Sequence, residues 1–170
     1  MKKFFAILLV LLLPVLCFAS YSDYYTARAE AKKAVAAGDI ELAVKMFLAA
    51  EAEADVLAAI PETELPWATY AEWQRNNAAN ALIESFKLNT NWVDTMEEIK
   101  QIPNGPERLK IADKLKETAM PHLPALLKAL EILNKRKFIK AEVMAKAKSN
   151  KEFCIWVIGW VKQTVRQRSF

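Results

Sequence analysis

The scarcity of glycine limits what this chain can fold into more than any other feature of its sequence. Its 170 residues include three glycines, Gly38, Gly105 and Gly159. Alanine, leucine, glutamate and lysine are abundant instead, and runs of β-branched residues are few. Because these four residue types have high intrinsic helix propensity, the composition predicts an all-α fold without a sheet.

Capping residues and prolines divide the chain into short helices. We expect seven or eight, over about residues 22–37, 40–59, 66–88, 92–101, 106–119, a segment that ends near 134, 138–148 and a last helix from 149. Ser22 or Asp23 is the candidate cap of the first helix, and Gly38 with Asp39 forms the turn after it. Ser149 and the glutamate three residues later match a capping box. Such short connections favour antiparallel helix pairs.

The first nineteen residues have the three-part organisation of a secretory signal peptide. Two lysines precede an apolar run, residues 4–16, and Cys17 and Ala19 supply small residues before a cleavage site. We expect cleavage after Ala19 and export of the chain to the periplasm or the medium. Two alternatives stay open. In the first, the segment is retained as a membrane anchor; against this, the apolar run is shorter than the ~20 residues of a spanning helix. In the second, Cys17 is lipidated as in bacterial lipoproteins; against this, the residue before Cys17 is not small.

The rest of the chain, residues 20–170, has the length of a single domain. After cleavage Cys154 would be its only cysteine, so packing rather than an intramolecular disulfide must stabilise the fold. The surrounding residues, FCIWVIGW, predict that Cys154 is a buried side chain. The sequence leaves the oligomeric state open.

The first helix pair carries apolar residues, most of them small, at helical spacing. They are Ala27, Ala31 and Ala34 before the turn, and Ile40, Ala43, Phe47, Ala50 and Ala54 after it. The segment AAGDIELAVKMFLAA, residues 36–50, resembles the turn and second helix of a tetratricopeptide repeat, and residues 125–148 match the same pattern more faintly. The resemblance implies stacked helix pairs, an α-solenoid, with a concave groove for a peptide or a partner helix. A compact helical bundle is the alternative.

One face of the long middle helix combines aromatic, amide and charged side chains. Its members are Trp73, Asn77, Asn80, Glu84 and Lys87, with Tyr70 beside them. Their spacing of four, three, four and three keeps them within about 40° of Trp73 around the helix. Such a row can hydrogen-bond a peptide backbone or stack on a sugar, so we take it as a candidate surface for another protein or peptide. The alternative is an ordinary solvent face with Trp73 packed under a neighbouring helix.

Charge is distributed unevenly along the chain. Residues 20–66 hold nine acidic and four basic side chains, whereas residues 135–168 hold ten basic and two acidic ones. The candidate basic surface consists of Lys135, Arg136, Lys137, Lys140, Lys146 and Lys148. It would attract an anionic lipid surface or a cell-wall polymer, which makes an envelope-associated protein the alternative function. A solvated helix surface would need no partner, and the export signal disfavours nucleic acid.

The sequence contains no recognisable catalytic motif. His122 is the only histidine, and the chain has no glycine-rich phosphate loop, no Gly-x-Ser-x-Gly elbow and no His-Glu-x-x-His zinc motif. We therefore expect no catalytic residue, metal or cofactor, and we predict a non-catalytic protein-interaction module that acts as a scaffold or adaptor. An enzyme that relies on two well-placed carboxylates stays open as a third reading.

Overall fold

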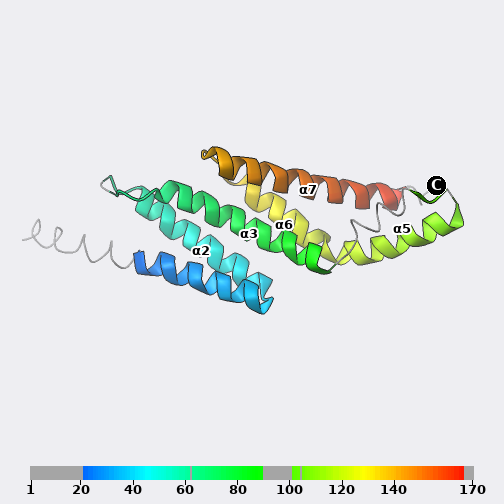
Figure 1. The fold of residues 1–170 in the computed structure, drawn as a ribbon, viewed down its shortest axis with the longest axis horizontal. Coiled ribbons are helices and arrows are strands. Elements are labelled where there is room, and N and C mark those ends of the chain that lie inside the picture. The colour runs from blue at the N-terminus through cyan, green and yellow to red at the C-terminus, as the bar shows by residue number, and fades with distance from the viewer. Residues whose placement is uncertain (1–20, 62, 90–100, 104, 167–170) are drawn as a thin grey trace, which may run out of the picture. The chain divides into compact units, whose positions relative to one another are not determined.

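The computed structural model of the protein describes residues 21–61, 63–89, 101–103 and 105–166. All regular secondary structure in these residues is helical, which confirms the predicted all-α class. A helix over residues 21–37 is followed by α2 (Ile40–Ala58), α3 (Trp67–Asn89), α5 (Pro106–Ala119), the 3-10 turn η1 (Met120–His122), α6 (Leu123–Asn134) and α7 (Ala141–Arg166) (Figure 1). The predicted signal segment, and the helix predicted over 92–101 except its last residue, lie outside the described residues.

The chain divides into two compact units, Met1–Ala78 and Ala79–Phe170. The helix α3 contributes its first half to one unit and its second half to the other. Within the described residues, no helix has an apolar stretch of the length and composition that membrane crossing requires.

The first turn forms where the sequence places it. Gly38 has a φ of +76°, a left-handed conformation that glycine adopts without steric cost. Asp39 then caps α2, because its Oδ1 accepts a hydrogen bond from the backbone N–H of Leu42 at 3.0 Å. The predicted cap of the preceding helix is wrong, since Tyr21 is already helical and neither Ser22 nor Asp23 precedes the helix.

Small side chains pack the first unit. The predicted stripes are buried except at Ile40, which is half-buried, and the exposed fractions are 6% or less at Ala27, Ala31, Ala34, Ala43, Phe47, Ala50 and Ala54. Alanine at these positions lets the two helices approach closely. The helix α2 ends at Ala58, ahead of Pro61, and α3 begins directly after Pro66, close to the predicted positions, because proline cannot continue a helix interior but is tolerated at its start.

Larger aliphatic side chains pack the second unit. The helices α6 and α7 lie against each other, and their buried residues include Leu126, Ile132, Leu133, Val143, Cys154, Val157 and Val161. The boundaries of α5 and the end of α6 agree with the predicted positions. Cys154 is fully buried as predicted, and burial raises the pKa of its thiol to about 11.

The prediction of two helices over residues 138–148 and from 149 is wrong. The structure has one continuous helix, α7, that begins at Ala141 and passes through Ser149. Its buried stripe runs on across this position from Ala147 to Cys154, and Lys148 and Glu152 form an ion pair of 3.8 Å one turn apart. A serine costs an exposed helix interior only about 0.5 kcal/mol, so packing on both sides outweighs the capping pattern.

Candidate functional site

An aromatic cluster organises one end of the first unit. Trp67, the first residue of α3, is 1% exposed. The rings of Tyr21, Tyr24 and Tyr70 meet its indole edge-to-face, with ring centroids 5.1, 5.1 and 5.3 Å away. Such arrangements are favoured by the ring quadrupoles. The cluster therefore fixes the rings of Tyr24 and Tyr70, which also face a cavity.

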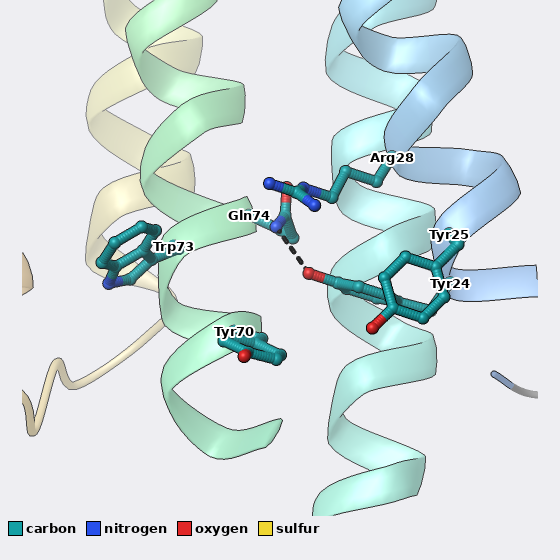
Figure 2. Close-up of a pocket in the computed structure, with 6 residues that line it drawn as sticks. All are labelled: Tyr24, Tyr25, Arg28, Tyr70, Trp73 and Gln74. Atoms are coloured by element: carbon teal, nitrogen blue, oxygen red, sulfur yellow. Dashed lines mark hydrogen bonds between the residues drawn. The ribbon is translucent and has the colours of Figure 1, made fainter. Parts of the chain in front are cut away.

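That cavity lies between the helix over residues 21–37 and α3, and has a volume of about 130 Å³. Its walls are Tyr24, Tyr25 and Arg28 from the first helix, and Tyr70, Trp73 and Gln74 from α3 (Figure 2). A water molecule occupies ~30 Å³ in the liquid, and pockets for drug-sized ligands start near ~300 Å³. The cavity therefore has room for one amino-acid side chain, or a group of that size, rather than for a nucleotide cofactor.

A buried amide forms the floor of this aromatic pocket. Gln74 is 2% exposed, and its Nε2 donates to the Tyr24 hydroxyl at 3.0 Å, as the dashed line in Figure 2 shows. Its Oε1 accepts from Asn77 Nδ2 at 3.5 Å. Burial raises the pKa of the Tyr24 phenol, while Arg28 and the Gln74 bond partly offset the rise. Tyr24 is therefore a neutral phenol at physiological pH.

Arg28 provides the only charged side chain in the pocket lining. Figure 2 shows its guanidinium extending from the first helix toward Gln74. Among the described residues it forms no ion pair. Arg75, the nearby arginine of α3, is different, because it is paired with the buried Glu51 at 2.6 Å. The pocket thus combines aromatic walls with one positive charge that is available for an anionic group.

The structure brings only part of the predicted α3 surface to this pocket. Tyr70 and Trp73 line it, and Asn77 adjoins it through Gln74. Trp73 is 46% exposed, so it is not packed under a neighbouring helix.

The remaining three residues of the predicted surface, Asn80, Glu84 and Lys87, belong to the second unit. Lys87 Nζ lies 3.3 Å from Glu84 Oε1 and 5.0 Å from the centre of the Phe153 ring. These contacts explain the side-chain positions of Glu84 and Lys87 without a partner.

Sequence reasoning missed Tyr24, Tyr25, Arg28 and Gln74 as candidate site residues. A signal was present, since the stretch YSDYYTAR places tyrosines and an arginine three and four residues apart on a helix, where they share one side. The alanine stripe lies beside them on the same helix, since Ala27 and Ala31 are within about 60° of Tyr24, which is itself buried.

The candidate basic surface is concentrated at the connection between α6 and α7. Lys135, Arg136, Lys137 and Lys140 lie in this turn, and Lys148 lies two helical turns further along α7. Lys135 binds Glu131 at 2.7 Å, and the hydrogen bond and charge of Lys135 lower the pKa of Glu131. Lys146 lies about 160° around α7 from Met144, so it does not share a face with that residue and Lys148.

The described residues contain no group of three or more histidine, cysteine, aspartate or glutamate side chains that would hold a metal ion. His122 meets the ring of Phe86 edge-to-face, with 5.3 Å between the ring centroids.

Comparison with known proteins gives no relative for this arrangement: no family model matches the chain, and no significant match exists among curated proteins or solved structures.

Proposed function

We propose that this protein is a non-catalytic interaction module, and that the aromatic pocket binds one side chain of a partner protein's peptide segment. The observation that carries the proposal is the pocket itself, built from aromatic walls, a buried amide and an arginine that pairs with no acidic residue in the described part of the chain. Tyrosine, tryptophan and arginine are the residue types enriched where protein interfaces gain most of their binding energy.

The position of the pocket fits such a role. It is lined by two helices, residues 21–37 and α3, that are separated in the sequence by α2. In stacked helix pairs, the first helices of successive pairs line the concave surface on which peptides bind. This is the arrangement that the resemblance to tetratricopeptide repeats implies.

The chemistry of the lining favours an acidic side chain as the ligand. Arg28 can form a charge-assisted hydrogen bond with a carboxylate, and the pocket lining includes no aspartate or glutamate that would repel one. Sugar hydroxyls are commonly bound by carboxylates, which this lining lacks. The aromatic rings would hold the aliphatic part of the ligand side chain or an apolar neighbour.

Selection of a random peptide display library on the purified protein tests this proposal. Selected peptides should share an acidic residue next to an apolar one. Their affinity should fall about tenfold or more in Trp73→Ala and about tenfold in Arg28→Gln. Lys45→Gln removes an exposed positive charge from α2 and is the matched control. Peptides that bind both pocket variants as tightly as the unchanged protein would contradict a role for the pocket.

We also propose that the chain is exported and acts in the periplasm or outside the cell, on the basis of its N-terminal residues. Determining the N-terminal residue of the protein isolated from its own host tests this proposal. Cleavage should leave Ser20 as the first residue. An intact Met1 would contradict cleavage, and a lipid on Cys17 would support the lipoprotein alternative.

A further inference from the structure

The turn between α6 and α7 exposes an isoleucine among basic residues. Ile139 is 79% exposed, more than any other large hydrophobic residue that the structure describes. Its neighbour Phe138 is 7% exposed and packs into the second unit, which holds the turn in place. Lys137 and Lys140 flank the pair and are both exposed. The turn therefore presents an aliphatic side chain outward at a fixed position.

The exposed surface continues onto α7. Lys140 precedes the helix and accepts the hydrogen bond from the backbone N–H of Met144 at 2.8 Å. Lys140, Met144 and Lys148 succeed one another at intervals of four residues, so they lie within about 80° around the helix. Met144 is 49% exposed, and the Lys148 side chain is 76% exposed. Exposed apolar and basic side chains thus follow one another along the turn and the first two turns of α7.

The charge of this region is strongly positive. Residues 131–148 contain six basic and two acidic side chains. Of the acidic residues, Glu131 is engaged with Lys135 at 2.7 Å, and beyond this range Glu152 pairs with the exposed Lys148 at 3.8 Å. The surface made by Ile139, Met144 and the exposed lysines 137, 140 and 148 is called the docking strip below.

We propose that the docking strip binds the surface of an anionic lipid bilayer. Ile139 enters the boundary between head groups and acyl chains, with Met144 beside it, while the lysines bind the lipid phosphates. Lysine suits this position, because its aliphatic stem lies along apolar material while its ammonium group stays in the polar layer. Combined apolar burial and attraction to anionic lipids is the mode by which surface-lying segments bind membranes without crossing them.

Two observations favour a bilayer over a protein as the occupant. Lysine is depleted from the buried centres of protein interfaces, whereas basic residues beside exposed aliphatic ones are typical of membrane-surface helices. A second copy of this chain is disfavoured as well, because it would place lysines of one docking strip against those of the other. The inference is independent of the pocket in the first unit.

Co-sedimentation of the full chain with lipid vesicles tests the proposal. The vesicles consist of equimolar phosphatidylcholine and phosphatidylglycerol, or of phosphatidylcholine alone. On the anionic vesicles, Ile139→Asp should lower the partition coefficient at least about tenfold, and Lys137→Gln about fivefold. Ile139→Phe should retain binding. On neutral vesicles, Lys137→Gln should have no effect. Every variant contains the same first twenty residues, and the partition of the unchanged protein on the neutral vesicles measures what the apolar run among them contributes.

Two substitutions outside the docking strip are matched controls. Lys146→Gln removes an exposed charge from another face of α7, and Val56→Ser removes an exposed apolar side chain from the first unit. Both should bind as the unchanged protein does, and circular dichroism checks that each variant is folded. Equal partition of the unchanged protein and Ile139→Asp would overturn the proposal. So would a loss in Lys146→Gln as large as that in Lys137→Gln, since it would show attraction to the overall charge alone.

Discussion

The two units of the molecule differ in where their candidate binding residues lie, around a cavity in the first unit and on an exposed turn and helix in the second. The first unit gathers tyrosine, tryptophan and arginine around a cavity, whereas the second exposes isoleucine, methionine and lysine on an outward turn and helix. Tyrosine, tryptophan and arginine are the residues of protein interfaces, and lysine with aliphatic residues is the combination of membrane surfaces. The contrast assigns the proposed peptide pocket and the proposed membrane-binding strip to different units.

The buried side chains of the two units also differ in type. The first unit buries alanines, a tryptophan and polar side chains such as Gln74, while α6 and α7 bury leucine, isoleucine, valine and a cysteine. The first unit thus holds buried polar side chains close to its pocket, whereas α6 and α7 meet through aliphatic ones. The predictions below test this difference, beginning with the largest effect.

Trp67 and Trp73 should separate folding from binding in the first unit. Trp67→Ala removes a buried ring that pairs with four tyrosine rings, and should lower the free energy of unfolding by roughly 3–5 kcal/mol. Trp73→Ala removes a half-exposed ring and should change it by no more than about 0.5 kcal/mol. Urea denaturation followed by circular dichroism measures both. Similar losses in the two variants would mean that Trp73 supports the fold rather than the pocket.

Cys154 should report how well the second unit excludes solvent. Its raised pKa of about 11, against an ordinary 9.0, leaves about one hundredth of the usual thiolate at neutral pH. In a Cys17→Ser background, its reaction with a disulfide reagent should therefore be at least about a hundredfold slower in the folded protein than in denaturant.

An exposed cysteine introduced by Ser149→Cys, with Cys154→Ala, is the matched control and should react at the rate of a free thiol. Fast reaction of Cys154 itself would contradict a sealed interior, and with it the contrast between the units.

Tyr24 should give the first unit a dependence of stability on alkaline pH. Its pKa is raised by burial above the ordinary value of 10.0, so the folded chain retains the phenolic proton when the unfolded chain has lost it. This contribution is complete below pH ~10 and is lost as the pH rises from there through the folded-state pKa. Unfolding measurements over this range should show a smaller decline in Tyr24→Phe than in the unchanged protein. Equal declines would contradict the burial of this phenol.

Structural features that depend on interactions between residues close in the sequence were predicted better than those that depend on distant residues. Gly38 and Asp39 specify their turn through bonds within a few residues, and the prolines mark helix starts for local steric reasons. These features were predicted correctly. Of the residues that line the pocket, only Tyr70 and Trp73 belong to the predicted α3 surface, and the contact of Gln74 with Tyr24 joins residues fifty positions apart in the sequence. Periodicity identifies the face of a helix but not the residues that another helix brings to it.

Ile139 illustrates a different limit. The sequence alone shows two adjacent apolar residues, Phe138 and Ile139, in a basic turn, and does not tell which one is buried. Tertiary packing decides the question, since Phe138 enters the core and Ile139 remains outside. The basic surface was therefore predicted without its apolar member, and the docking strip becomes visible only in the structure.

The smallest effect tests the continuity of α7. If Ser149 lies inside one helix, Ser149→Ala should raise the free energy of unfolding by about 0.5 kcal/mol, because alanine has the higher helix propensity. If Ser149 instead caps a separate helix, the same change should cost about 1 kcal/mol. Ser149→Gly is the matched control, since glycine destabilises a helix interior but costs a cap only a few tenths. The two arrangements predict opposite signs for the alanine variant, so thermal denaturation distinguishes them even though the energies are small. A loss of stability on alanine substitution would indicate that α7 is interrupted at Ser149, between the docking strip and the buried residues Cys154, Val157 and Val161.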